Sequence, residues 1–282
     1  MIKDYIIETM NQDEVNLAID WAAREGWNPG SHDAVCFYQT DPNGFFAGKL
    51  KGKTIAVGSA VIYDDHFAFC GFYIVDKSYR DQGYGLELTK ARLSYIGNRN
   101  AGIDGVMNML DKYARIGYQL AHNNARYRLN DAIKISQNDS HIVALNQTDF
   151  LQLSHYDRLH FPAPRPKFLK CWINQPQSRA LGYLSEGQIQ GYGVIRTCQQ
   201  GFKIGPLFAN TPEIAHQLFT NLAQYADGCE IFLDIPENNP SAIELVQQYQ
   251  MSKVFATARM YLKGEPQLKK ENIYGITTFE LG

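Results

Sequence analysis

The sequence has few of the features that mark secreted or membrane proteins. Its five cysteines, at positions 36, 70, 171, 198 and 229, are odd in number, widely spaced and without a CxxC pair, which argues against a disulfide framework. The longest apolar run, residues 67–75, is too short to cross a bilayer, and the first ten residues do not resemble a signal peptide. We therefore expect a soluble cytoplasmic protein with no membrane partner, whose cysteines are small core residues.

The sequence also lacks a surplus of either charge. The 27 Lys and Arg residues against 29 Asp and Glu give a net charge of −2, and no basic block offers a stripe for phosphates, so nucleic acid is not an expected partner. The histidines form only one loose pair, His155 and His160, which we interpret as surface residues rather than metal ligands. With 282 residues, the chain is long enough for one large or two medium domains with real cores.

Periodicity predicts the same series of elements twice: strand, turn, strand, turn, strand, helix, strand, helix, strand. A helix that begins at Asn11, with Glu14 completing a capping box, precedes the first series. Next we expect a short strand at residues 34–38 and, later, one continuous strand at residues 67–75. A polar stretch separates the two halves, and we place domains at residues 1–137 and 138–282. Residues 272–280 are strand-like and are expected to pair back onto a sheet.

The most informative segment joins the strand of residues 67–75 to the following helix, and it contains Arg80, Gly83 and Gly85. Glycines let the backbone turn tightly and approach a ligand, while a helix N-terminus offers free amides and the positive end of a dipole. Together they suit a pyrophosphate. A P-loop is excluded because GK[ST] is missing, and a dinucleotide fold is disfavoured because no glycine triplet follows the first strand. The alternative interpretation is that these glycines only form a tight turn between the strand and the helix and bind no ligand.

These residues resemble a known family. The pattern Arg80-x-x-Gly83-x-Gly85, after Val75 and Tyr79, is similar to the acyl-CoA-binding motif of the GNAT (GCN5-related N-acetyltransferase) family. The order of the predicted strands agrees with that fold over about residues 1–135.

A second signature lies further along the chain. Tyr113-x-x-x-Gly117-Tyr118 after Asn108 resembles the family's Asn…Tyr-x-x-x-Gly-Phe, with two residues fewer between Asn108 and Gly117 than usual. The segment of residues 25–33 and the second half as a whole resemble a bacterial subfamily of tandem GNAT proteins.

The resemblance implies an α/β protein of two tandem GNAT-type domains, each a mixed, mostly antiparallel, twisted sheet flanked by helices. It implies acetyl-CoA as the donor, no metal, and a primary amine of a small molecule or peptide as the acceptor. Tyr113 would protonate the leaving thiolate, and a strand amide near Val75 would stabilise the tetrahedral intermediate. The predicted acyl-CoA-binding residues are Tyr73, Ile74, Val75, Arg80, Gln82, Gly83, Tyr84, Gly85, Leu86 and Asn108.

The second half of the chain lacks the first of these two motifs. Its strand at residues 202–208 continues into Ala209-Asn-Thr-Pro-Glu213, where proline lacks a donor and the glutamate repels phosphate. The tyrosine position of the second motif holds Val246. We therefore predict that this half keeps the fold, does not bind acyl-CoA and shapes the acceptor site. The candidate substrate residues are Asn28, Asp33, Asp157 and Asp234, each of which also has a structural interpretation in a turn, a cap or an ion pair.

The general base is not assigned by the sequence. Neither Asp nor Glu lies on the strand of residues 67–75, where many relatives carry the base, and Asp33, Asp64, Asp65 and His66 are the candidates. Two alternatives stay open for this reason: a CoA-binding or sensing module that has lost turnover, and a transferase of a longer acyl chain.

Overall fold

The computed structural model describes residues 2–130 and 140–282. Its first half contains β1 (Tyr5–Thr9), α1 (Gln12–Arg24), α2 (Asp33–Thr40), β2 (Phe45–Leu50), β3 (Lys53–Ser59), β4 (Val61–Ile62), β5 (Phe67–Phe69), β6 (Ile74–Val75), η1 (Lys77–Tyr79), α3 (Tyr84–Ile96), β7 (Asn100–Val106), η2 (Met107–Met109), α4 (Leu110–Ile116) and β8 (Gln119–Leu129).

The second half contains β9 (Ile142–Ala144), η3 (Leu145–Gln147), α5 (Phe150–Arg158), α6 (Pro166–Trp172), β10 (Ser178–Ser185), β11 (Gln188–Thr197), β12 (Phe202–Ala209), α7 (Pro212–Ala223), η4 (Gln224–Ala226), β13 (Ile231–Pro236), α8 (Pro240–Gln248), β14 (Ser252–Tyr261), η5 (Lys270–Asn272) and β15 (Ile273–Gly275). Among the described residues, no helix is long and apolar enough to cross a bilayer.

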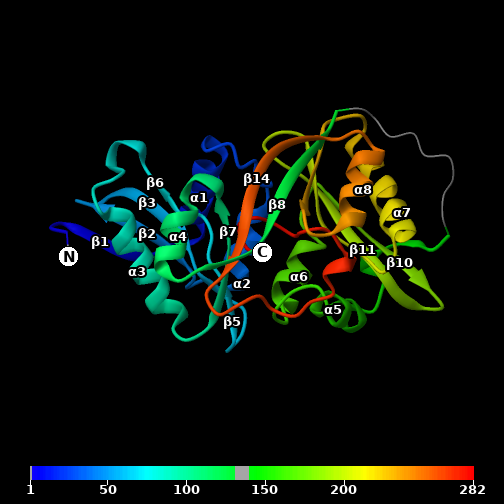
Figure 1. The fold of residues 1–282 in the computed structure, drawn as a ribbon, viewed down its shortest axis with the longest axis horizontal. Helices are drawn as coiled ribbons and strands as arrows, with labels where there is room; N and C mark the ends of the chain where they lie inside the picture. Colours follow the sequence, from blue (N-terminus) through cyan, green and yellow to red (C-terminus); the bar gives the residue numbers. More distant parts are fainter. Residues whose placement is uncertain (1, 131–139) are drawn as a thin grey trace.

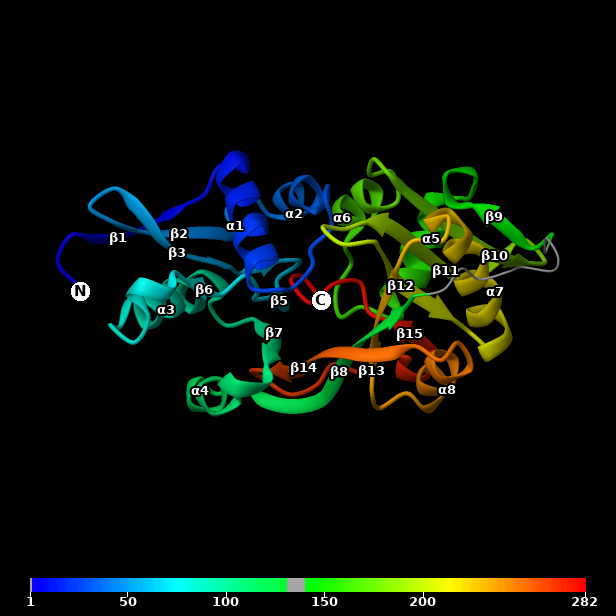
Figure 2. The same cartoon turned by 90° about the horizontal axis from the view of Figure 1, so that it is seen from above.

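The strands form two sheets. One has four strands in the order β1-β2-β3-β6, and the other has eleven, in the order β4-β5-β7-β14-β8-β13-β12-β11-β10-β9 with β15 beside β12. The named pairs are antiparallel except β5 with β7 and β12 with β13. Helices flank the sheets in both halves (Figures 1 and 2). This confirms the predicted mixed, mostly antiparallel α/β fold.

The first helix forms as its local sequence predicts. The side chain of Asn11 accepts from the amide of Glu14 at 3.0 Å, and the Glu14 carboxylate accepts from the amide of Asn11 at 3.0 Å. This is the capping box, which satisfies two otherwise free helix amides. Buried Val15, Ala18, Ile19 and Ala22 form the apolar face of the helix.

The strand predicted at residues 34–38 is wrong, because these residues belong to helix α2. Cys36 and Phe37 are fully buried on this helix, and Phe37 stacks on Trp172 of α6 with ring centroids 6.0 Å apart. The apolar residues therefore face a helix of the second half. A five-residue apolar run cannot by itself distinguish a buried strand from a buried helix.

The predicted continuous strand at residues 67–75 is divided in two. Phe72 lies between the pieces with a positive φ of 48° and is buried, an uncommon conformation for a bulky residue. The first piece, β5, pairs with β7, and the second piece, β6, pairs with β3 of the other sheet. The chain thus passes from one sheet to the other within five residues.

The two halves exchange strands. β14, from the end of the second half, lies between β7 and β8 of the first half, and β8 in turn pairs with β13 of the second half. Figure 1 shows β8 and β14 side by side at the centre of the molecule. The sheet is therefore continuous across the halves. The domain boundary predicted between residues 137 and 138 lies outside the described residues and stays a proposal.

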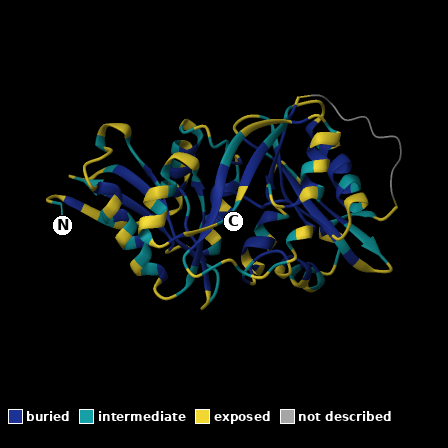
Figure 3. Ribbon diagram, in the orientation of Figure 1, coloured by how far each residue is buried: buried dark blue, intermediate teal, exposed yellow. Residues whose placement is uncertain are grey.

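Buried contacts reinforce this connection. One core cluster contains Val15 of α1, Phe72, Leu153 of α5 and Trp172 of α6, and Figure 3 shows buried residues running through the central strands. A disulfide joins Cys36 of α2 to Cys171 of α6, with Cα atoms 5.3 Å apart. The expectation that the five cysteines are small core residues outside any disulfide is therefore wrong for this pair, and it is also wrong for Cys229, which is exposed.

Candidate active site

The loop before α3 ends at a helix N-terminus that no side chain caps. The Asp76 carboxylate accepts from the amide of Ser78 at 2.9 Å and closes the turn η1. Gly83 follows in the left-handed conformation with a φ of 88°, and the helix begins at Tyr84 without a side-chain cap. Free amides at the positive end of a helix dipole attract anions. The loop therefore offers free amides to an anion, and binding of a pyrophosphate there stays a prediction.

The side chains of this loop are held by local contacts. Arg80 donates from Nε to the Val75 carbonyl at 2.8 Å, and its Nη2 forms an ion pair with Glu25 at 2.7 Å. Gln82 is exposed and donates to the Ser78 carbonyl at 3.1 Å. Leu86 is also exposed. Binding of acyl-CoA by these residues stays a prediction.

Gly85 allows β6 to pack directly on the first turn of α3. A Cβ at this position would overlap the hydroxyl of Tyr73 and would lie 3.2 Å from Cγ2 of Val75. Sequence reasoning attributed this glycine to the approach of a ligand. The structure adds a second reason for a glycine at this position, because the side chains of Tyr73 and Val75 occupy the space where a Cβ would lie.

β6 and β7 separate at Gly71. The Cys70 amide still donates to the Gly102 carbonyl of β7 at 2.9 Å, whereas Gly71 exchanges hydrogen bonds with Ser59 of β3 at 2.8 and 3.2 Å. Arg92 of α3 stabilises this point by donating to the carbonyls of Ser59 and Gly71 at 2.7 and 3.2 Å. Beyond Gly71, β6 and β7 belong to different sheets. We call the region between these two diverging strands the slot, and it is the place where an extended ligand is expected to bind. Ile74 and Val75 lie on the β6 side of this slot.

Tyr113 lies on α4 and packs on β7 of the same slot. A Cβ at Gly105 would lie 2.5 Å from the Tyr113 ring, so the strand needs a glycine there. Burial raises the pKa of Tyr113 above its usual value, although Arg92 works against this. The hydroxyl is therefore protonated at neutral pH, as a proton donor must be. Asn108 is exposed on η2, and its predicted contact with CoA stays a prediction.

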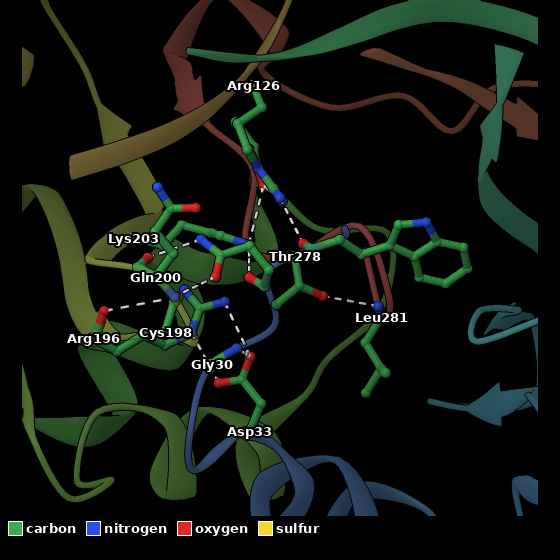
Figure 4. Close-up of polar contacts among 12 residues, drawn as sticks. Gly30, Asp33, Arg126, Arg196, Cys198, Gln200, Lys203, Thr278 and Leu281 are labelled. Carbon is green, nitrogen blue, oxygen red and sulfur yellow. Dashed lines mark hydrogen bonds and ion pairs between the residues drawn. The ribbon is translucent and has the colours of Figure 1, made fainter. Parts of the chain in front are cut away.

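The three candidate substrate carboxylates are buried in ion pairs. Asp33 pairs with Arg196 at 2.9 Å, Asp157 with Arg165 at 2.8 Å and Asp234 with Arg126 at 2.6 Å. Figure 4 shows Asp33 with Arg196, and Arg126, in one region, where Gly30 of the loop that follows α1 lies beside Asp33. While paired, none of these carboxylates is free to hold a cationic acceptor, and the geometry favours the structural interpretation.

Asn28 helps to close the same region. Its side chain exchanges hydrogen bonds with the backbone of Gln200 at 3.0 and 2.8 Å, and its carbonyl accepts from Nζ of Lys203 at 2.7 Å. Its φ of 49° is the left-handed conformation that asparagine tolerates. Asn28 is thus a turn residue that connects the first half to the turn between β11 and β12 and to β12 itself.

The remaining candidates for the base lie on a surface turn. The Asp64 carboxylate accepts from the amides of His66 and Phe67 at 2.8 and 2.7 Å, and exposed Asp65 pairs with Arg99 at 3.4 Å. This turn joins β4 to β5, before the point at which the strands separate.

The prediction that His155 and His160 are both surface residues is wrong for His160, whose exposed fraction is 3%.

The corresponding slot in the second half is closed. Thr211 caps α7 by accepting from the Ile214 amide at 3.3 Å, and Pro212 and Glu213 form its first turn. β15 pairs with the end of β12, and the Ile276 amide donates to the Asp234 carbonyl of β13 at 2.8 Å. The chain itself therefore lies between β12 and β13. This confirms, for residues 273–276 of the segment 272–280, the expectation that it pairs back onto a sheet.

Sequence reasoning missed two buried acids near the point where β6 and β7 separate. Asp104 of β7 forms a two-point ion pair with Arg259 of β14 at 2.9 and 2.7 Å. Glu280 is 2% exposed, and neither of its carboxylate oxygens has a hydrogen-bond partner among the described residues. Its carbonyl lies against Gly71, where the strands separate. No local sequence pattern marks either residue, because strand exchange and the folded-back tail bring them to the site.

Comparison with known proteins agrees with this geometry. The model described as "Acetyltransferase (GNAT) family" matches residues 13–115, and the one described as "Acetyltransferase (GNAT) domain" matches residues 153–275. A holothin acyltransferase from Pseudoalteromonas sp. (strain SANK 73390) is 28% identical over 273 residues, which cover 96% of this chain and 92% of the relative.

Solved structures share the fold over the whole chain. A crystal structure assigned as an acetyltransferase from Pyrococcus horikoshii has a TM-score of 0.85 at 22% identity and covers 100% of this chain and 97% of its own. A tandem GNAT protein from the clavulanic acid biosynthesis pathway has a TM-score of 0.65 at 13% identity and covers 91% and 98%. The two family models fall in separate halves, as the motifs predicted, and the chain is therefore an acyltransferase of the GNAT family with two GNAT domains in tandem.

Proposed function

We propose that the first half transfers an acetyl group from acetyl-CoA to the primary amine of a small molecule. The observation that carries this proposal is the difference between the two slots. β6 and β7 separate beside an uncapped helix N-terminus, whereas β15 fills the counterpart in the second half and Thr211 caps its helix. One acyl-CoA per chain follows from this difference.

The residues around the slot are suited to bind the acyl donor, acetyl-CoA. Acetyl-CoA, when bound, supplies an activated thioester. The amides at residues 82–85 and the Arg80 guanidinium would hold its phosphates, and the edge of β6 at Ile74 and Val75 would hold its extended arm. The acceptor nitrogen attacks the carbonyl carbon, the carbon–sulfur bond breaks, and the amine gives up one proton to water. Tyr113 donates a proton to the departing thiolate.

A small-molecule acceptor is proposed over a peptide. The Pseudoalteromonas relative, which matches nearly the whole chain, is named for acylation of holothin. Acetyl remains the proposed group, and longer acyl chains are tested beside it.

The test is thiol release from acyl-CoA donors of increasing chain length, with amino acids, polyamines, aminoglycosides, peptides and aromatic amines as acceptors. We expect release that depends on both an amine and acetyl-CoA. Calorimetry should show one acyl-CoA per chain, and two sites of similar affinity would refute the assignment of the slots. Tight binding without release for every amine would instead support the sensing module.

A further inference from the structure

A buried arginine at the closed end of the slot carries a further inference. Arg92 lies on α3 and is 7% exposed. Its Nε and Nη2 donate to the carbonyls of Ser59 and Gly71 at 2.7 and 3.2 Å. These two residues also exchange backbone hydrogen bonds at 2.8 and 3.2 Å, at the point where β6 leaves β7. One guanidinium therefore holds both carbonyls that define the point of separation.

The charge of Arg92 has no counter-charge among the described residues. A guanidinium stays protonated in proteins. The other buried arginines, Arg126, Arg165, Arg196 and Arg259, each pair with an aspartate, whereas no carboxylate of the described chain pairs with Arg92. Because an uncompensated buried cation destabilises a fold, we expect an anion to meet this one when the protein functions.

One nitrogen of Arg92 is available to such an anion. Nη1 has no hydrogen-bond partner in the described part of the chain, and, unlike Nη1 of Arg165 and Arg196, it is not sealed from solvent. The stem of the side chain passes beneath β3, where a Cβ at Gly58 would lie 3.0 Å from Cδ. The guanidinium lies over the Tyr73 ring of β6, 5.5 Å from its centroid. The side chain thus reaches from the helix to the slot with one donor unused.

The position of Arg92 along α3 separates it from the expected phosphate site. The free amides lie at the start of the helix, at Tyr84, and Arg92 follows eight residues later, about 12 Å along the axis at about 1.5 Å per residue. Gly71 precedes Val75 by four residues, which span at most about 14 Å. An extended donor whose phosphates bind at the helix start, and whose arm follows β6, therefore has its thioester end near Arg92.

Arg92 also acts on the tyrosine that is proposed as the proton donor. Burial raises the pKa of Tyr113, and the charge of Arg92 is the largest influence that opposes this rise. Burial likewise raises the pKa of Tyr118, and Arg92 again opposes it. Both tyrosines pack in one cluster with Cys70 and Tyr73, and none of these four titratable groups is a carboxylate. The cation therefore favours negative charge at this end of the slot.

We propose that Arg92 is a further residue of the acyl-transfer site, which fixes the separation of β6 and β7 and supplies positive charge beside the leaving thiolate. The inference rests on the proposed function and adds a residue to it. As the amine nitrogen bonds to the carbonyl carbon, the carbon–sulfur bond breaks and its electron pair stays on sulfur, beside Nη1 of Arg92. Tyr113 then gives its proton to sulfur, and the proton that the amine gives up passes through water to the phenolate.

The test compares CoA with desulfo-CoA, which has the same phosphates and no thiol. Calorimetry on the full chain measures both affinities at pH 7 and pH 9. A cation beside the sulfur lowers the pKa of the bound thiol, so CoA should bind more tightly as the thiol ionises. If that pKa falls from about 8.5 to about 7.5, the ratio of the two affinities should rise about sixfold between these pH values. The ratio removes the titration of groups that both complexes share, and the comparison needs no variant.

Two variants and a matched control assign the effect to one side chain. Arg92→Met keeps a straight apolar stem, and it should abolish the pH dependence of the ratio and lower kcat by about 10²-fold. Arg92→Lys keeps the charge and should retain part of both. The control is Arg99→Met, because Arg99 also donates to two backbone carbonyls, those of Asp64 and Ile96 at 2.7 and 3.1 Å, but lies beside the turn between β4 and β5. It should leave the ratio and kcat unchanged.

A ratio that is equal at both pH values would overturn the inference, and so would a pH dependence that survives in Arg92→Met. A purely structural role predicts the latter result together with a lower Tm. Thiol release from acetyl-CoA with a constant ratio would refute the role of Arg92 and leave the proposed function standing. The expected ratio without thiol release for any amine would refute the proposed function and leave Arg92 as a group that binds the thiolate.

Discussion

Replacing Asp234 by Asn tests whether the buried charges serve stability or substrate binding. Asp234 lies directly opposite Arg126 in the register of β13 and β8, where the two halves meet. Its two oxygens accept from the Arg126 guanidinium at 2.6 and 2.7 Å, and Lys203 lies 3.9 Å away. The three side chains are at most 3% exposed. The substitution keeps the shape and removes the counter-charge of two buried cations.

The expected loss of stability is large. Removing one partner of a buried ion pair costs about 3–5 kcal/mol, which corresponds to a fall in Tm of about 6–10 °C at about 2 °C per kcal/mol for a chain of this size. Burial works against ionisation, but Arg126 and Lys203 outweigh it and hold the pKa of Asp234 below its usual range. The stabilisation is therefore present above the ordinary carboxyl pKa and is lost as the pH falls through the native value.

A matched control lies three residues further along. Glu237 pairs with Lys253 at 2.5 Å, but its side chain is 26% exposed and that of Lys253 is 44% exposed. Because such a pair contributes about 0–1 kcal/mol, Glu237→Gln should leave Tm nearly unchanged. Calorimetric scans at pH 7 and at acid pH measure both variants, and the difference between Asp234→Asn and the unaltered protein should shrink in acid.

One result would refute this reasoning. If Asp234→Asn melts within about 2 °C of the unaltered protein, which is about 1 kcal/mol or less, the pair does not stabilise the junction to the expected extent. A rise in the acceptor KM with unchanged Tm and unchanged acyl-CoA KM would then assign Asp234 to substrate binding.

Three further predictions concern the slot and its surroundings. Gln82→Glu should weaken acyl-CoA binding in calorimetry at unchanged Tm, because it adds negative charge beside free helix amides, whereas Gln82→Ala should bind nearly normally. Tyr113→Phe should lower kcat by about 10²–10⁴-fold with acyl-CoA affinity retained, and full turnover would leave Tyr113 a packing residue. Burial raises the pKa of Glu280, although Lys203 and Arg126 oppose this, so its ionisation destabilises the fold as the pH rises through that value. Glu280→Gln should therefore raise Tm at pH 8 more than at pH 5, and an equal change at both pH values would contradict this.

Features that depend on neighbouring residues could be predicted from the sequence. The capping box of Asn11 and Glu14 fixed the start of α1. The run from Arg80 to Gly85 placed a positive-φ glycine before a helix N-terminus, and Thr211 with Pro212 marked the capped counterpart in the second half. These signals are readable because each forms within a few residues, through backbone conformation and local hydrogen bonds.

Contacts between distant segments could not be predicted in this way, because they form only in the folded chain. Strand periodicity predicts the strands of the second half but does not encode their partners, and β14 pairs with strands more than 120 residues away. The break at Phe72, the helix at Asp33–Thr40 and the disulfide between Cys36 and Cys171 all depend on such partners. The burial of Asp33, Asp157 and Asp234 in ion pairs has the same cause. Hydrogen bonds and ion pairs between segments leave no period in the sequence, so they appear only when the chain is folded.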